Sequence, residues 1–248
     1  MPYLSLIIPA YNEANRLEPS LCKALEYFEC CSYSVEILVV NDGSTDATRE
    51  VAERVAMQDA RVRLLEQPYN MGKGAAVRCG MMAAEGEYRI FSDADFSTPI
   101  HEVERVLERL EQGVDVCIGS RGLRPSLVGK HQPWYREKLG KLVNIVVQAM
   151  FLPGITDTQC GFKGFRASVA RAIFGQARLN GWMFDVEVLY IAMLLGFRIE
   201  EIPVEWYNDE RSTVRLSHAW QIIREMRAIK RLHAHLYHSA PQCLQVWK

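Results

Sequence analysis

Short apolar runs alternate with segments of helical spacing over the first 120 residues of the chain. The apolar runs are rich in β-branched residues, and polar, Gly or Pro residues close most of them. This pattern predicts strands that are buried on both faces and connected by helices, which is typical of a mostly parallel sheet. The predicted strands are 4–8, 35–40, 62–65, 88–91 and 114–118, and the predicted helices are 16–28, 46–57, 73–84 and 99–112.

The pattern after residue 120 is less regular, and it contains no repeat and no linker. We expect one α/β domain over 1–215, Rossmann-like with helices on both faces of the sheet, and a basic helix and tail at 216–248. Ser44 or Thr45 is predicted to cap the second helix, and Pro99 to lie in the first turn of the fourth. The predicted later helices are 139–151, 185–195 and 217–236, and the predicted later strands are 161–166 and 197–204.

Composition excludes several classes of protein. The 248 residues are 49% hydrophobic and 24% charged, which suits a folded globular protein and not a disordered one. The net charge of −1 argues against binding of nucleic acid through overall basicity. The longest apolar stretches, 142–152 and 188–195, are shorter than the roughly 18 residues of a membrane span, and the first residues lack the pattern of a signal peptide. Seven scattered cysteines without C-x-x-C spacing predict reduced thiols in a cytoplasmic protein.

Charge is unevenly distributed along the chain. Segments 119–141 and 211–238 each carry a net charge of +5, so the rest of the chain carries −11. Two basic stretches on an acidic body predict local contact with phosphate groups, on a substrate or on anionic lipid. Solvated helix faces are the alternative.

Two carboxylates follow the predicted strand 88–91, namely Asp93 and Asp95 on either side of Ala94. Ligands of open parallel sheets bind beyond the carboxyl ends of the strands. Two ionised carboxylates this close repel each other unless a cation lies near them. A hard divalent ion whose shell a diphosphate completes fits that requirement, and a solvated acidic turn is the alternative.

Polar groups also follow the first two strands. Asp42 is a candidate acceptor for a ribose or base, Tyr11 is able to stack on a base, and Glu13 is able to pair with its N–H groups. A turn or a helix cap would explain the same residues without a ligand. The Gly72–Lys73–Gly74 segment does not form a Walker motif, because Gln67 stands where the first glycine is needed and no Ser or Thr follows Lys73.

Four of these segments in this order, 5–13, 39–46, 70–74 and 93–95, resemble the inverting glycosyltransferases of family 2. Segments 119–121, 157–163 and 184–187 narrow the resemblance to the polyprenyl-phosphate branch, whose members glucosylate or mannosylate dolichyl phosphate. The resemblance covers roughly residues 3–215.

The resemblance implies a GT-A fold with a nucleotide-sugar half at 1–120 and an acceptor half at 121–215. It implies a nucleotide-diphosphate sugar as donor, with UDP-glucose favoured, and Mg or Mn as cofactor at Asp93 and Asp95. The implied nucleotide-binding residues are Pro9, Tyr11, Glu13, Val40, Asp42, Lys73 and Ala94, with Lys73 near the base or ribose. The implied residues for the acceptor and its phosphate are Arg121, Gln159, Lys163 and Arg211.

The chain departs from the pattern of the branch at two positions. Ser97 stands where the mannose synthases have Gln, so the metal would rely more on phosphate and water. Thr213 stands where a lysine is expected, so Arg211 or Arg215 would have to supply that charge.

A polyprenyl phosphate needs little base catalysis, because its second pKa near 6 leaves it nucleophilic at pH 7. Arg121 and Arg211 would hold phosphate in a forked geometry. A hydroxyl acceptor would need a general base, and Asp185 or Asp157 would be the candidate. We therefore expect inverting, metal-assisted transfer of a hexose, glucose favoured, to a polyprenyl phosphate. The alternatives are a glycosyltransferase that acts on a saccharide or other hydroxyl, and a nucleotide-sugar-binding protein without activity.

Apolar residues at helical spacing over 142–150, just after Trp134 and Tyr135, predict an element that lies in a membrane interface. The basic helix at 217–236 is a second candidate, and core-facing packing is the alternative. These features predict a peripheral protein on the inner, cytoplasmic face of a membrane, in contact with anionic lipid.

Overall fold

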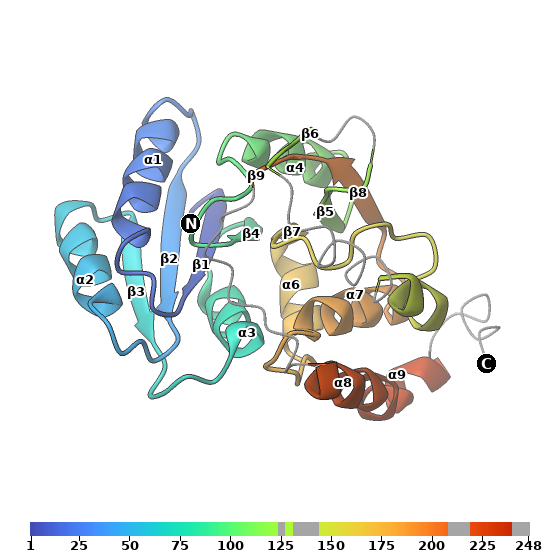
Figure 1. Cartoon of the computed structure of the whole chain (residues 1–248). Helices are drawn as coiled ribbons and strands as arrows, with labels where there is room; N and C mark the ends of the chain where they lie inside the picture. The colour runs from blue at the N-terminus through green and yellow to red at the C-terminus, as the bar shows by residue number, and fades with distance from the viewer. Residues whose placement is uncertain (124–126, 131–143, 208–218, 240–248) are drawn as a thin grey trace.

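A seven-stranded sheet forms the centre of the computed structural model, which describes residues 1–123, 127–130, 144–207 and 219–239 (Figure 1). The strand order is β3-β2-β1-β4-β7-β5-β8, and every neighbouring pair is parallel except those of β7, which runs antiparallel to β4 and β5. The expected mostly parallel sheet is therefore confirmed. The strands are β1 Leu4–Ala10, β2 Val35–Asn41, β3 Val62–Glu66, β4 Tyr88–Ser92, β5 Val116–Ser120, β7 Phe162–Arg166 and β8 Ile199–Pro203.

Helices cover both faces of this sheet, because successive strand residues point to opposite sides. Ile7 packs into a core with α3, α6 and α7, whereas its neighbours Leu6 and Ile8 pack into a second core with α1, α2 and α4. The C-terminal helix α8 joins the first core through Met226 and Ile229. The helices are α1 Leu17–Glu29, α2 Thr48–Gln58, α3 Lys73–Ala83, α4 Glu102–Glu111, α6 Ala167–Phe174, α7 Phe184–Leu194, α8 Ala219–Leu232 and α9 Ala234–Ser239.

Several details differ from the sequence predictions. Helix α6 and the small parallel sheet of β6 Leu127–Lys130 and β9 Glu205–Tyr207 were not predicted. The predicted helix 217–236 is two helices, which meet at His233. Residues 144–150 are helical, as predicted. The start of that predicted helix, 139–143, lies outside the described residues.

The predicted helix cap at Ser44 or Thr45 and the predicted helix start at Pro99 were wrong. Asp46 Oδ1 accepts the first amide of α2, from Thr48 (3.0 Å), and the Ser44 hydroxyl accepts the amide of Asn12 instead. Pro99 lies in a turn before α4, and its carbonyl accepts the amide of Glu102, the first residue of that helix.

Within the described ranges, no helix combines the length and the apolar character that a membrane crossing requires. The six described cysteines are all free thiols.

Candidate active site

The carboxyl ends of β1, β2 and β4 lie side by side at one edge of the sheet, because Ala10 pairs with Asn41 and β1 is flanked by β4. Several hydrogen bonds join the loops after β1 and β2. The Asn12 amide donates to Ser44 Oγ (3.0 Å), the Thr45 amide donates to Asn12 Oδ1 (2.9 Å), and the Ala14 amide donates to Asp46 Oδ2 (3.2 Å). Asn12 holds a left-handed conformation with φ of 56°. The structure therefore brings the predicted nucleoside residues of both loops to one edge.

The predicted nucleoside residues differ in how they are presented. Tyr11 is exposed, with 42% of its surface accessible, and Pro9 is half-buried at the end of β1. Val40 and Ala94 are buried in the two cores, so a ligand would meet their backbone and not their side chains.

Asp42 ties the end of β2 to the start of α3. Its Oδ1 accepts the amide of Met71 (2.8 Å), and its Oδ2 accepts the amide of Gly72 (2.9 Å). Burial raises the pKa of this carboxyl, and the two amides offset part of that rise. Gly72 needs to be glycine, since its φ is 101° and a Cβ would lie 2.3 Å from the Asn180 carbonyl oxygen. Asp42 thus fixes the turn that presents Lys73, and its predicted contact with a ribose or base stays a prediction.

Lys73 is the first residue of α3, and its Nζ lies 2.5 Å from Oδ1 of Asp93. Burial lowers the pKa of Lys73, but the charges of Asp93 and Asp185 together raise it above the ordinary value. The ammonium is therefore charged and neutralises Asp93. A contact of Lys73 with the base or ribose stays a prediction.

Asp95 has a different cation nearby. Its Oδ1 accepts the amide of Ser97 (2.9 Å), and its Oδ2 lies 3.8 Å from Nη1 of Arg16. Arg16 also forms a two-bond fork with Glu13, at 2.6 and 2.7 Å. Burial and the neighbouring Asp93 raise the pKa of Asp95. Arg16 was not predicted as a site residue, although it lies three residues after Glu13, where a helix begins.

Asp93 and Asp95 fit a divalent cation whose remaining ligands come from a diphosphate and water. Their side chains are 38% and 21% exposed, so an ion is able to reach them. Neither belongs to a trio of close metal-ligating side chains in the part of the chain that is described. The trio found there is His101, Glu102 and Glu205, in which the buried Glu102 already binds Arg105 and the amide of Glu205.

Arg121 follows β5 and forms a fork with Asp157. Its Nε lies 2.7 Å from Oδ2 and its Nη2 lies 2.8 Å from Oδ1, while its amide also donates to Oδ2 (3.0 Å). The ring centroid of Trp206, a residue that was not predicted to belong to the site, lies 5.3 Å from the guanidinium carbon. Burial raises the pKa of Asp157, but Arg121 more than offsets this and the pKa is lowered. The fork with Arg121 therefore keeps Asp157 ionised, and its predicted role as a general base stays a prediction.

Asp185, in the first turn of α7, is paired with Lys163 of β7. The Lys163 Nζ lies 2.5 Å from Asp185 Oδ1, and it also donates to the Cys160 carbonyl (2.5 Å). Lys163 has no exposed surface. An ammonium so enclosed is not open to an acceptor phosphate, because it would have to leave both oxygens. In the structure Lys163 holds Asp185, and its predicted contact with the acceptor phosphate stays a prediction.

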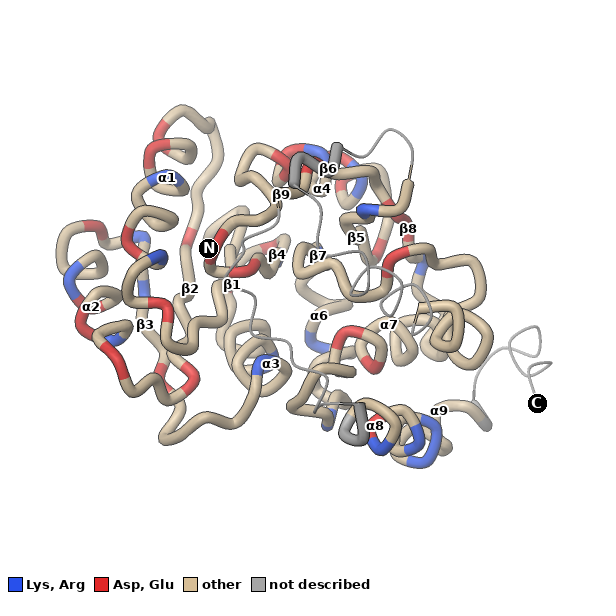
Figure 2. The backbone as a smooth tube through the Cα atoms, viewed as in Figure 1, with Lys and Arg blue, Asp and Glu red and all other residues tan. Residues whose placement is uncertain are grey.

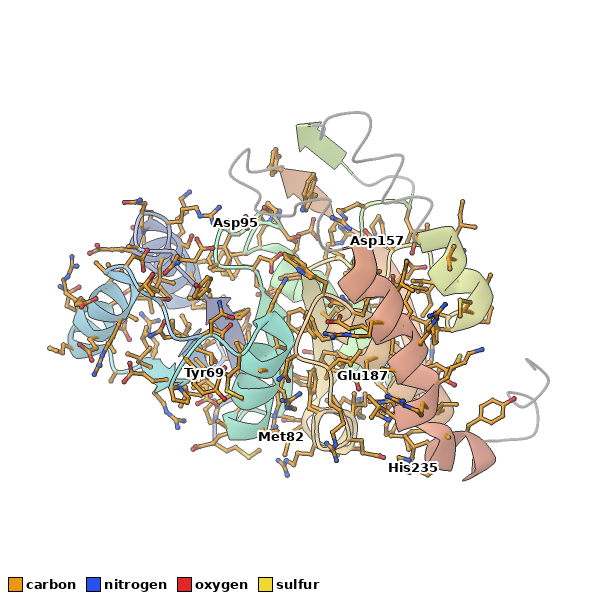
Figure 3. The ribbon with its side chains drawn as sticks, turned by 60° about the horizontal axis from the view of Figure 1, so that its bottom comes forward. Tyr69, Met82, Asp95, Asp157, Glu187 and His235 are labelled. Atoms are coloured by element: carbon orange, nitrogen blue, oxygen red, sulfur yellow. The ribbon has the colours of Figure 1, made fainter. Side chains whose placement is uncertain are left out.

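Asp93 lies against the 157–163 segment. A Cβ on Gly161 would lie 2.1 Å from Oδ2 of Asp93, so the side chain of Asp93 rests against this glycine. Gln159 donates to the Trp182 carbonyl at 3.5 Å. In Figure 3, Asp95 and Asp157 lie toward the same edge of the molecule, while Glu187 lies lower, beside α8. Arg211 and Arg215 lie outside the described residues, as do Thr213, Trp134 and Tyr135.

The fold and this edge of the sheet define a glycosyltransferase of the GT-A class. Residues 5–174 match the family described as "Glycosyl transferase family 2", and the chain belongs to that family.

Relatives and solved structures agree with this assignment. The chain is 36% identical over 227 residues to a dolichyl-phosphate beta-glucosyltransferase of Trichomonas vaginalis. The matched region covers 87% of this chain and 69% of the relative. It is 33% identical over 230 residues to the mouse protein of the same name, with 88% and 71% covered. Glucosyl-3-phosphoglycerate synthase from Mycobacterium tuberculosis, in complex with Mn2+, UDP-glucose and phosphoglyceric acid, has a TM-score of 0.69 at 16% identity, with 97% of this chain and 81% of that chain covered. At that identity the likeness concerns the fold.

Proposed function

We propose that this chain transfers glucose from UDP-glucose to the phosphate of a polyprenyl phosphate, with inversion and with a divalent cation. The observation that carries the proposal is that both acidic candidates for a general base are held by cations, Asp157 by Arg121 and Asp185 by Lys163. An acceptor phosphate needs no such base. The names of the relatives, dolichyl-phosphate beta-glucosyltransferases, support the same acceptor class.

The reaction is a single displacement. An oxygen of the acceptor phosphate attacks the anomeric carbon of the sugar, and the bond from that carbon to the nucleoside diphosphate breaks as the new bond forms. Asp93 and Asp95 would hold the cation, which would neutralise charge on the leaving diphosphate. The chain's own part is to position the two reactants and to stabilise charge that develops on phosphate.

Arg121 is the residue best suited to orient a phosphate. Its planar guanidinium is held by Asp157 on one edge and lies over the ring of Trp206, so its direction is fixed before any ligand binds. A pre-oriented fork loses little side-chain entropy on binding phosphate. We assign Asp157 and Trp206 to the positioning of Arg121.

The test is transfer of radiolabelled sugar from UDP- and GDP-sugars to polyprenyl phosphate by the purified chain, with and without a chelator. We expect labelled lipid from UDP-glucose, and loss of the product when EDTA is added. Label on a saccharide but not on the lipid would favour the hydroxyl-acceptor alternative. Binding of UDP-glucose without transfer to any acceptor would favour the non-catalytic one.

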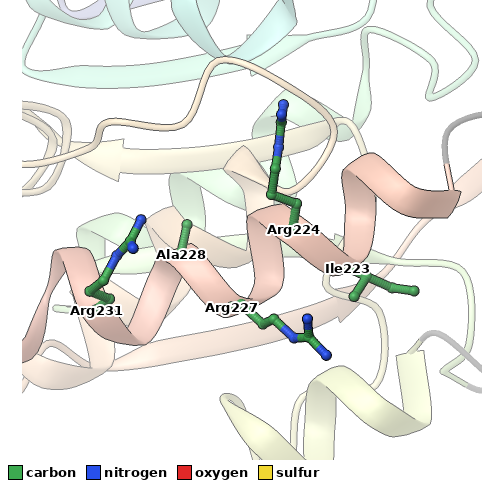
Figure 4. Close-up of a pocket in the computed structure, with 5 residues that line it drawn as sticks. All are labelled: Ile223, Arg224, Arg227, Ala228 and Arg231. Carbon is green, nitrogen blue, oxygen red and sulfur yellow. The ribbon is translucent and has the colours of Figure 1, made fainter.

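We also propose that α8 and the helix at 144–150 form a surface that docks on anionic membrane. Arg224, Arg227 and Arg231 line a hollow of about 290 Å³ together with Ile223 and Ala228 (Figure 4). Figure 2 displays the Lys and Arg residues gathered along α8. Basic side chains on one helix with apolar neighbours are typical of an interfacial element.

The helix at 144–150 contributes exposed apolar side chains to this surface. Ile145 is 62% exposed, and Val146 and Met150 are also exposed. Lys230 of α8 lies over the ring of Phe151, 5.6 Å from its centroid, so the two helices are neighbours.

The free thiols of the described cysteines support a reducing compartment, which favours the cytoplasmic face.

Flotation with phosphatidylserine vesicles tests this surface. The triple variant Arg224→Glu, Arg227→Glu and Arg231→Glu is expected to lose vesicle binding at low salt. The matched control reverses the same number of exposed charges on α1 and α2, at Lys23, Arg49 and Arg54, and is expected to bind as the wild type does. Equal loss in both triple variants would contradict a specific surface on α8.

A further inference from the structure

Lys73 occupies one of the two carboxylates that the proposed function assigns to the metal. Its Nζ lies 2.5 Å from Oδ1 of Asp93, while the other oxygen of Asp93 rests against Gly161. Oδ1 of Asp93 is therefore occupied by the ammonium, whereas Oδ2 only lies close to Gly161. Divalent cations bind carboxylate oxygens at about 2.0–2.6 Å, which is the space that this ammonium fills.

The backbone of Lys73 is fixed, so only its side chain is able to leave. Asp42 holds the amides of Met71 and Gly72 just before it, and the Asn180 carbonyl accepts the amide of Gly74 just after it (2.9 Å). The side chain itself is 32% exposed, and its four-carbon stem is flexible. The ammonium is thus free to move while α3 stays in place.

A lysine and a divalent ion repel each other strongly at one oxygen, because the two positive charges would lie a few ångströms apart. A nucleoside diphosphate changes this balance, since its phosphates accept both the divalent ion and the ammonium. The ammonium then has a second anionic partner within reach of its stem.

We infer that Lys73 is a built-in counter-cation for Asp93, which must move from the carboxylate to the donor's phosphates before the metal binds there. The metal and the nucleoside diphosphate therefore bind as a coupled pair, and the metal alone binds weakly. This inference rests on the proposed function only in that the donor carries a diphosphate.

The test measures Mn²⁺ binding to the full chain by electron paramagnetic resonance of the free ion, with and without UDP. In the wild type, UDP is expected to raise the affinity for Mn²⁺ at least tenfold. In Lys73→Met, Mn²⁺ alone is expected to bind at least tenfold more tightly than in the wild type, and UDP is expected to add much less. Because coupling between two ligands is reciprocal, the effect of Mn²⁺ on UDP affinity must shrink by the same factor.

Lys23→Met is the matched control, since it removes one lysine charge on the exposed face of α1 and leaves Asp93 untouched. Lys73→Gln is the second variant, which keeps a polar side chain if Lys73→Met does not fold. Equal Mn²⁺ affinity in the wild type and in the folded Lys73 variant would overturn the inference. Coupled binding of Mn²⁺ and UDP without transfer to polyprenyl phosphate would overturn the proposed function and leave this inference standing.

Discussion

Lys163 and Asp185 form an ion pair that is almost fully removed from solvent, with side chains 0% and 6% exposed. The variant Lys163→Met leaves Asp185 buried without this partner, and we expect the free energy of unfolding to fall by about 3–5 kcal/mol. The double variant Lys163→Met/Asp185→Leu is expected to lose less, because it removes both charges. Urea unfolding of Lys163→Met, of Asp185→Leu and of the double variant measures the difference. Losses that simply add would show that the two charges do not interact.

The Arg121–Asp157 pair predicts how stability depends on pH. Because the pKa of Asp157 is lowered in the folded state, its contribution is fully present above the unfolded value of about 3.9 and is lost as the pH falls through the lowered value. The difference in unfolding free energy between the wild type and Asp157→Asn should therefore be constant from about pH 5 to pH 8. Denaturant unfolding across that range checks this. A difference that already shrinks at pH 6 would mean that the pKa of Asp157 is raised.

Two clusters of side chains are candidates for the cation site: Asp93 with Asp95, and the trio of His101, Glu102 and Glu205. If the cation binds at Asp93 and Asp95, then Asp93→Ala and Asp95→Ala should each lower kcat by about 10²–10³, the range found when one stabilising contact to a developing anion is lost. Glu205→Gln, in the trio with His101 and Glu102, should retain the metal-dependent rate. A rate that depends on Glu205 and not on Asp93 would move the site to that trio.

Gly161 is predicted to control the position of Asp93. In Gly161→Ala, the added Cβ would lie 2.1 Å from Asp93 Oδ2, so the carboxylate must turn away. We expect the affinity for Mn²⁺ in the presence of UDP to fall about tenfold, a loss of about 1.4 kcal/mol, with little change in melting temperature. Asp93→Asn is the reference variant, because it weakens the ligand without adding an atom. An unchanged affinity in Gly161→Ala would mean that Asp93 is not a ligand in the conformation described.

Glu187 is predicted to hold the segment between α6 and α7 in place. Its carboxylate accepts the amides of Arg178 (2.9 Å) and Leu179 (2.8 Å), and it lies 2.7 Å from Nε2 of His233. In His233→Ala, the two amides keep their acceptor but the buried carboxylate loses a partner, which costs about 1–3 kcal/mol. Faster hydrogen exchange at Arg178 and Leu179 is the expected signature. Glu225→Gln is a comparison variant, since Glu225 of α8 accepts an amide four residues after Leu179, that of Met183 (3.0 Å).

Much of the first half of the fold was predictable because its signals are local. The apolar runs that end at Ile8, Val40 and Phe91 are the strands β1, β2 and β4, extended by one or two residues. These strands are buried on both faces, so every residue in them had to be apolar or hydrogen-bonded. The acidic residues after these strands were predicted as site residues for the same reason, because a polar group directly after such a strand lies at its carboxyl end.

The parts that were missed depend on partners far away in the chain. Nothing local marks Lys163 as buried, because its partner Asp185 is 22 residues further on and belongs to another element. The break between α8 and α9 falls at His233, which pairs with Glu187, 46 residues earlier. Helical periodicity continues through that position, so the sequence predicted one helix where tertiary contacts make two.

The antiparallel strand β7 ties the first 120 residues, predicted to bind the nucleotide sugar, to the segment 121–215, predicted to bind the acceptor. It belongs to the second segment by sequence, yet it lies between β4 and β5, which both come from the first. A fragment that ends at residue 120 would therefore lack β7, the strand that pairs with both β4 and β5. Exchange of the segments before and after residue 120 between related enzymes would therefore need β4, β5 and β7 to match one another. For protein engineers, the whole sheet is the better unit to exchange.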